Sequence, residues 1–202
     1  MPMLSLKERI ALLERDLGSE PPGFVITADL PFAIFRYDPA HPEEGEWRVR
    51  REVLNLKTRV ESKTGRRVHL LPLSDLFWRS ISEAEGLETL VALERQRGFR
   101  AAQQQVHTYL SDPDWPCLPV LLREAAGGLD PRRDYLFLTR ATVFAPAAYR
   151  ISALLEQMKD RLTVPTVLFY PGTWTGSLNY MGMRSDDALP GSYRVKIYGR
   201  ET

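Results

Sequence analysis

Residues 135–139 read YLFLT and residues 166–170 read TVLFY, and these two apolar runs decide the fold. Both have the length and the aromatic and branched side chains that are typical of buried strands. Residues 145–159 lie between them and are expected to form a helix. Two strands joined through a helix predict a strand–helix–strand unit with parallel strands, which many nucleotide-binding folds repeat.

The turn after the first of these strands lacks the glycines of a phosphate-binding loop. It reads RATVFAP at residues 140–146. Glycines let backbone N–H groups close around a phosphate, and no glycine-rich phosphate-binding motif follows any other expected strand either. We therefore interpret the unit as the frame of a nucleotide-binding fold without its phosphate loop.

Strands and helices alternate along the rest of the chain as well. An apolar stripe at helical spacing runs through Val49, Val53, Leu56 and Val60, and Gly65 follows as a stop signal. A further helix is expected at residues 4–17, and a short one begins near residue 74. Further strands are expected at residues 31–37, 68–72 and 193–198.

This alternation predicts an α/β fold with a mainly parallel five-stranded sheet and helices on both faces. Such a fold is Rossmann-like or P-loop-NTPase-like, here without the phosphate loop. We expect residues 1–202 to form a single domain, for which the length suffices. The helical block at residues 82–126 is longer than one crossover needs, so we interpret it as a helical insertion that forms a cap or an interaction arm.

Composition places the chain among soluble proteins without a strong charge preference. Twenty-seven Lys and Arg residues against 26 Asp and Glu residues give a net charge of +1, which argues neither for nor against a nucleic-acid partner. The single cysteine, Cys117, excludes an intramolecular disulfide and fits a reducing compartment. No apolar run approaches the roughly 20 residues of a membrane span. We expect a cytoplasmic protein with no membrane contact.

Residues for catalysis or metal binding do not form a recognisable pattern. His41, His69 and His107 fall in a turn, a strand and a helix, and Cys117 has no histidine near it in sequence. No G-x-S-x-G motif marks a nucleophile. We therefore predict no catalytic, cofactor-binding or metal-binding residues and no enzyme activity. Polar groups at the strand ends leave one alternative open, a degenerate nucleotide-binding protein.

Residues 48–67 form a basic segment, with eight Lys and Arg residues against two Glu residues. The candidate basic face consists of Arg48, Arg51 and Arg59. Such a face could contact DNA phosphates or an acidic protein. A solvated helix face without any partner is the simpler alternative, and the sequence leaves all three open.

A long loop is expected at residues 171–191, and it is rich in glycine and large side chains. We name Trp174, Tyr180, Met181 and Met183 as candidate partner-binding residues, because protein interfaces are enriched in aromatic residues and Met. The alternative is that the loop folds back and buries these side chains over a sheet end.

Several segments together carry a family resemblance. They are FAIFRY at residues 32–37, GFRAAQ at 98–103, VHTYL at 106–110, VPTVLFYPG at 164–172 and YRVKIY at 193–198. In combination they resemble the BrxB family of BREX bacteriophage-exclusion systems, over about residues 4–198.

The resemblance implies a context for the protein. BREX systems methylate host DNA and block the replication of unmodified phage. They combine a methyltransferase, a PglZ-type alkaline-phosphatase-like protein, a large AAA+ ATPase and small accessory proteins, to which this family belongs. The expected function is therefore a non-catalytic adaptor that binds the PglZ-type subunit, with the methyltransferase or the ATPase as further partners. A DNA-contacting accessory protein and a degenerate nucleotide-binding protein are the alternatives.

Overall fold

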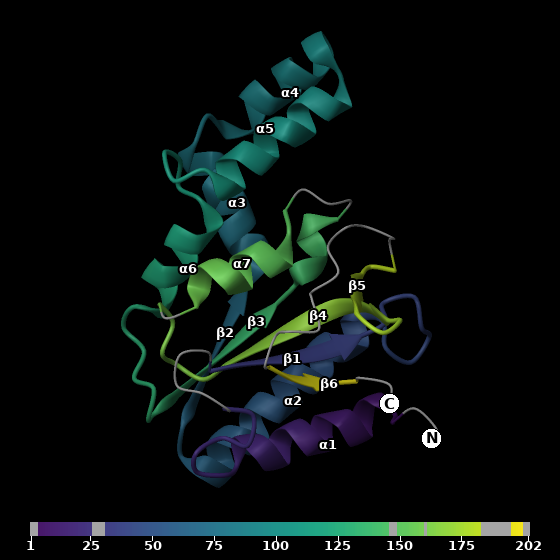
Figure 1. Cartoon of the computed structure of the whole chain (residues 1–202), viewed down its shortest axis with the longest axis vertical. Coiled ribbons are helices and arrows are strands. Elements are labelled where there is room, and N and C mark those ends of the chain that lie inside the picture. The colour runs from purple at the N-terminus through teal and green to yellow at the C-terminus, as the bar shows by residue number, and fades with distance from the viewer. Residues whose placement is uncertain (1–3, 26–30, 146–148, 160, 183–194, 200–202) are drawn as a thin grey trace.

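The computed structural model describes residues 4–25, 31–145, 149–159, 161–182 and 195–199, in which a central sheet lies between layers of helices (Figure 1). The strands are β1 (Phe32–Tyr37), β2 (Arg67–Pro72), β3 (Asp134–Thr139), β4 (Thr166–Trp174), β5 (Leu178–Tyr180) and β6 (Lys196–Tyr198). Their order is β2-β3-β4-β1-β6 with parallel neighbours, and β5 pairs with β4 antiparallel. The predicted α/β fold with a mainly parallel sheet is confirmed, and β5 is an addition to it.

Helices cover both faces of the sheet, as the alternation predicts. In the described part of the chain they are α1 (Leu6–Leu17), α2 (Glu46–Thr64), α3 (Leu73–Glu83), α4 (Gly86–Arg97), α5 (Phe99–Ser111), α6 (Leu118–Ala126) and α7 (Ile151–Met158), with the short 3-10 helix η1 (Ala141–Phe144) before α7. α1 and α2 lie on one face, and α3, α6 and α7 lie on the other (Figure 1). None of these described helices combines the length and the hydropathy of a membrane span.

The layer of α1 and α2 packs through apolar stripes on the two helices. In α2 the stripe of Val49, Val53, Leu56 and Val60 is buried at the predicted spacing. Gly65 ends the helix in the left-handed conformation, with φ 70°, as a glycine at this position favours. The stripe packs against side chains on one face of β1, β3 and β4, which positions the start of α2 beside the carboxyl end of β1.

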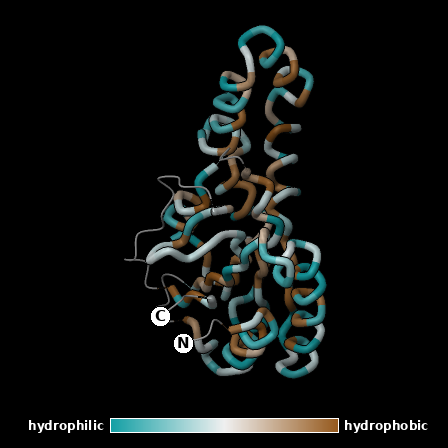
Figure 2. Tube along the Cα trace, turned by 90° about the vertical axis from the view of Figure 1, so that its right-hand side faces the viewer, coloured by the Kyte–Doolittle hydropathy of each residue, from teal (hydrophilic) through white to brown (hydrophobic). Residues whose placement is uncertain are grey.

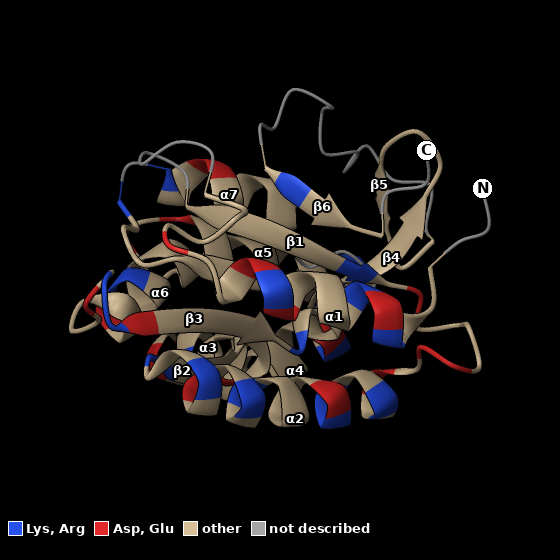
Figure 3. Ribbon diagram, turned by 90° about the horizontal axis from the view of Figure 1, so that it is seen from below, with Lys and Arg blue, Asp and Glu red and all other residues tan. Residues whose placement is uncertain are grey.

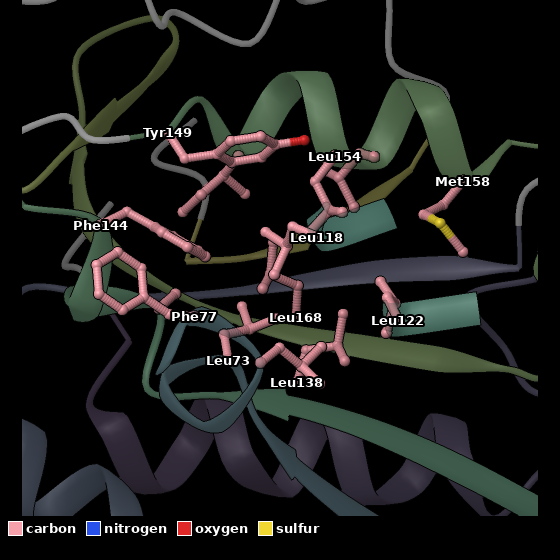
Figure 4. Packing of buried hydrophobic residues seen from close by; sticks show 14 of the residues in the cluster. Leu73, Phe77, Leu118, Leu122, Leu138, Phe144, Tyr149, Leu154, Met158 and Leu168 are labelled. Atoms are coloured by element: carbon pink, nitrogen blue, oxygen red, sulfur yellow. The ribbon is translucent and has the colours of Figure 1, made fainter. Parts of the chain in front are cut away.

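The opposite face of the sheet carries the larger core (Figure 4). Leu138 of β3 and Leu168 of β4 cluster with side chains of α3, α6 and α7, and with a few side chains of α4 and α5. These include Leu73 of α3, Leu118 of α6 and Leu154 of α7. Because β1, β3 and β4 are buried on both faces, they read as continuous apolar runs in the sequence.

The helices of residues 82–126 divide into a projecting part and a part of the body. α4 and α5 form a hairpin that stands away from the sheet at the top of Figure 1. α6 packs in the core beside α3 and α7, and residues 112–117 separate it from α5. We call the hairpin of residues 86–111 the arm. The extent of the domain, residues 1–202, stays a prediction.

The long loop predicted at residues 171–191 is wrong in its first part. β4 continues through Pro171 and Gly172 to Trp174, and β5 pairs back with it after a tight turn. A Cβ at Gly172 would lie 2.2 Å from the carbonyl oxygen of Asn179. The Pro-Gly pair therefore marks a close approach of two strands and not the end of one.

Two other expected elements differ in extent. α7 begins only at Ile151 and not at residue 145, and residues 146–148 lie outside the described residues. Arg140 adopts a left-handed conformation with φ 55° and turns the chain from β3 directly into η1. The final strand, expected at residues 193–198, is described only as β6, which pairs parallel with β1.

Candidate functional site

Buried charged side chains of the protein itself occupy the carboxyl edge of the sheet around β1. Doubly wound folds bind their ligands at this edge. Arg9 of α1 is 1% exposed, Arg36 of β1 is 2% exposed, and Glu44 in the turn before α2 is 2% exposed. Arg9 pairs with Glu44 and donates from Nη1 to the carbonyl oxygen of Arg36 at 2.5 Å. Since Arg36 also donates from Nε to the carbonyl oxygen of Gly199 at 2.9 Å, these contacts tie four segments together.

The N-terminus of α2 carries carboxylates at the position that a phosphate would take after the first strand of a nucleotide-binding fold. Glu43 and Glu44 precede the helix, and Glu46 lies in its first turn. Burial raises the pKa of Glu44, but hydrogen bonds from Arg9 and from the Asp38 N–H outweigh burial and lower it. A helix N-terminus attracts anions, and the protein's own carboxylates already lie there. This arrangement disfavours a phosphate group at the turn.

A second cluster of charges, around Asp134, joins β2 to β3 at their amino ends. The Asp134 carboxylate lies 3.1 Å from Nε2 of His69 and accepts from Nε of Arg67 at 2.8 Å. Burial raises the pKa of Asp134, but hydrogen bonds from a backbone N–H, His69 and Arg67 outweigh it and bring the pKa to about 2. His107 lies on α5 and takes no part in this cluster. Across the described residues, no three His, Cys, Asp or Glu side chains are grouped to hold a metal ion.

The arginines of the candidate basic face are engaged in contacts within the protein. Arg48 pairs with Glu43, and Nε of Arg59 donates to a carboxylate of α1 at 2.7 Å. Arg51 lies over the ring of Trp47, 4.8 Å from its centre. A few acidic residues lie among the more numerous basic residues of α2 in the view from below (Figure 3). Interspersed carboxylates weaken the attraction of this face for DNA phosphates, so the geometry gives the DNA alternative no support.

The four candidate partner-binding residues of the predicted loop have different environments. Tyr180 is 3% exposed, and its hydroxyl donates to the carbonyl oxygen of Ala141 at 2.8 Å. Trp174 and Met181 are partly buried against the core, and Met183 lies outside the described residues. The hairpin of β4 and β5 thus folds back over the sheet end and brings Tyr180 into the core. The role of these residues in partner binding stays a prediction.

An apolar groove lies where the arm meets the body. It has a volume of about 220 Å³ and is lined by α3, α4, α5 and the segment around η1. Seven large hydrophobic side chains of the described residues are exposed, and four of them line this groove. They are Trp78 at 51%, Leu87 at 55%, Val91 at 38% and Phe99 at 56% exposure. Figure 2 shows hydrophobic segments continuing from the body into the arm. Such a concentration of exposed apolar side chains marks an interaction site.

The sequence did not single out this groove. The sequence predicts a cap or an interaction arm at residues 82–126, with an apolar group of Leu87, Leu90, Val91 and Leu93, but it does not show which of these side chains stay exposed. The structure buries only Leu90 among these four, because α4 leaves the body and packs mainly on α5. The signal in the sequence that points to the arm is the length of the helical block at residues 82–126. It exceeds what one crossover needs, which indicates helices that do not all pack on the core.

These features define an α/β protein with an open, mainly parallel sheet. Its own buried charged side chains occupy the carboxyl edge of the sheet around β1, and its helical arm carries an exposed apolar groove. Residues 69–197, well over half of the chain, match the family model described as BREX protein BrxB. The chain therefore belongs to the BrxB family, which implies a role in phage defence and suggests other BREX subunits as partners. The comparisons with curated proteins and with solved structures give no match.

Proposed function

We propose that this BrxB-family protein is a non-catalytic adaptor that binds other subunits of a BREX assembly. The PglZ-type subunit is the first partner, and the methyltransferase and the AAA+ ATPase are further ones. The observation that carries the proposal is the arm groove, which gathers four exposed apolar side chains in one place. A partner that covers these side chains would remove apolar surface from water, and this favours its binding.

The range of the family match supports the same surface. Every residue that lines the arm groove falls within residues 69–197. The candidate basic face of Arg48, Arg51 and Arg59 falls outside this range. A function that the family shares is therefore better sought on the arm than on α2.

The absence of a catalytic role is part of this proposal, and the closed sheet edge supports it. The charged groups of Arg9, Arg36 and Glu44 are engaged by contacts within the chain, so they stabilise the fold there. Carboxylates at the start of α2 disfavour a nucleotide at the turn where related folds bind one.

Co-purification tests the proposal. The purified chain is mixed at micromolar concentration with the PglZ-type subunit, the methyltransferase and the ATPase of the same BREX system, each in turn. We expect the chain to elute with the PglZ-type subunit in size-exclusion chromatography. Separate elution from all three subunits contradicts the adaptor function. A DNA shift by the chain alone at low salt would instead support the DNA-contacting alternative.

A further inference from the structure

A second depression lies on the other side of α5, between α5 and α7. Its volume is about 720 Å³, and we call it the cationic pocket. Its lining includes Arg100, Gln104 and His107 from α5, together with Arg150 and Gln157 from the start and the side of α7. None of the described lining residues is Asp or Glu. The pocket therefore has the charge and the hydrogen-bond donors that a carboxylate requires.

The two arginines of this pocket differ from Arg48 and Arg59 of α2. Arg100 and Arg150 are both exposed, and neither forms an ion pair with another described residue. On α2, by contrast, Arg48 and Arg59 pair with glutamates of the same protein. An arginine without an internal carboxylate is available for a carboxylate of a partner.

The cationic pocket and the arm groove are neighbours on α5. Gln103 lines both of them, and Phe99 of the groove directly precedes Arg100 of the pocket. One ligand lying across α5 would meet an apolar surface on one side and a cationic surface on the other. The groove also contains one carboxylate, Glu94, so the excess of positive charge lies on the pocket side.

We infer that α5 is the centre of a docking site for an acidic amphipathic helix of a partner protein. The inference rests on the proposed adaptor function and names the chemistry of its contact. The partner helix would place large apolar side chains into the groove and Asp or Glu residues towards Arg100 and Arg150. Helices commonly bind in this way, with apolar residues three and four positions apart in a groove. Charges beside the groove set the orientation and the rate of association.

Nucleic acid fits this surface less well than a protein helix. Aromatic side chains with arginines can bind single strands by stacking on bases. The interior of the groove, however, is largely aliphatic, with Leu87, Leu90 and Val91 on α4 facing Val106 on α5. Branched aliphatic side chains offer no ring for a base to stack on, whereas they pack well against the apolar face of a helix.

Binding of the purified PglZ-type subunit, measured by calorimetry at low and at high salt, tests the site. Replacing two exposed groove residues, in Leu87→Gln/Phe99→Gln, should weaken binding at least about tenfold. Reversing the pocket charges, in Arg100→Glu/Arg150→Glu, should weaken it about tenfold at low salt and remove most of its salt dependence. Hydrogen exchange of the subunit should show protection in a helix with acidic residues beside its apolar face.

Matched variants elsewhere on the surface serve as controls. Trp47→Gln/Leu54→Gln removes two exposed apolar side chains from α2, and Arg132→Glu/Arg133→Glu reverses two exposed charges before β3. We expect both to bind like the unchanged chain. Circular dichroism of every variant shows whether it is folded.

The outcomes separate this inference from the adaptor function. Unchanged binding by the groove and pocket variants overturns the docking site and leaves the adaptor function standing. Loss with the groove variant alone overturns the acidic character of the partner. If a DNA oligonucleotide binds and only Arg100→Glu/Arg150→Glu abolishes it, nucleic acid occupies the pocket and the inference fails. No binding of any BREX subunit by the unchanged chain overturns both proposals.

Discussion

The carboxyl edge of the sheet buries charged side chains, whereas the arm exposes apolar ones. At the edge, Arg9, Arg36 and Glu44 are almost fully buried, and each is bound within the chain. On the arm, Leu87 and Phe99 are more than half exposed in a groove that nothing in the described chain fills. The edge is where related folds bind nucleotides, yet here it holds the fold together. The arm exposes apolar side chains instead, and it is the surface on which we propose that a partner binds.

This difference predicts where substitutions act. Removing one partner of a buried ion pair leaves a charge in a site without water, and that costs far more than losing an exposed contact. Removing an exposed apolar side chain costs the folded protein almost nothing, but it lowers the free energy gained when a partner covers the groove. Substitutions at the edge should therefore reduce stability, and substitutions on the arm should reduce binding.

The largest effect is expected at the buried ion pair. Glu44→Gln should lower the free energy of unfolding by about 3 kcal/mol, because Arg9 would keep its charge in a buried site without a counter-ion. Urea denaturation at neutral pH measures this. The neighbouring Glu43→Gln, which removes the exposed partner of Arg48, should cost about 0.5 kcal/mol or less. Equal and small effects would show that the edge is open enough to admit a ligand.

A smaller effect is expected where β4 and β5 approach each other at the same edge. Gly172→Ala should cost about 2 kcal/mol, since the added Cβ would lie 2.2 Å from the carbonyl oxygen of Asn179 and the hairpin must move. Thermal denaturation is the measurement. Gly128→Ala is the control, because a Cβ there meets nothing within 4 Å. Similar melting temperatures for both variants would mean that the β4–β5 hairpin can move without a loss of stability and is not a rigid part of this edge.

The charge cluster around Asp134, at the amino end of the sheet, should make the free energy of unfolding depend on pH. The pKa of Asp134 is about 2 in the folded protein, below the ordinary value of 3.8. Its contribution is therefore complete above the ordinary value and is lost as the pH falls from about 4 towards 2. Asp134→Asn should cost about 1–2 kcal/mol at pH 7, and its difference from the unchanged chain should narrow below pH 4.

Denaturation curves between pH 2 and pH 7 check this. The control is Asp114→Asn, which changes an exposed aspartate in the turn between α5 and α6. It should follow the unchanged chain at every pH. A constant difference for Asp134→Asn across this range would show that the carboxylate is not held in its charged form by Arg67 and His69.

Much of the fold was predictable because its signals are local. The stripe of Val49, Val53, Leu56 and Val60 gives α2, and strands buried on both faces stand out as apolar runs. The hairpin at Gly172 was missed because its reason is a contact with a residue further along the chain. A local pattern cannot show that the Pro-Gly pair lies inside a strand.

The site was harder to predict for the same physical reason. Arg9 lies beside the apolar stripe of α1, three residues after Leu6 and four before Leu13, but its ion-pair partner Glu44 is 35 positions away and no local pattern shows that pairing. The groove requires knowing that α4 and α5 leave the body, so that Leu87 and Phe99 have no core to join. Apolar spacing is the same in a helix that joins the core and in one that awaits a partner. The absence of a phosphate loop was readable, since it depends on glycines in one turn.

The smallest effect on the free energy of unfolding is expected for substitutions of exposed side chains on the arm. Leu87→Gln/Phe99→Gln should change the free energy of unfolding by no more than about 0.5 kcal/mol, because both side chains are already more than half in water. Urea denaturation of the isolated chain measures this, with Leu90→Gln as the contrasting variant. Leu90 lies on α4 with Leu87 but is only 5% exposed, so Leu90→Gln should lower the free energy of unfolding by at least about 2 kcal/mol.

If the groove variant were as destabilised as Leu90→Gln, the arm would be packed through Leu87 and Phe99, and its surface would belong to the fold as the sheet edge does. A groove variant that keeps its stability but fails to bind the PglZ-type subunit would separate two functions of apolar side chains within the arm. Leu90 would then hold α4 in place, and its exposed neighbours would bind the partner.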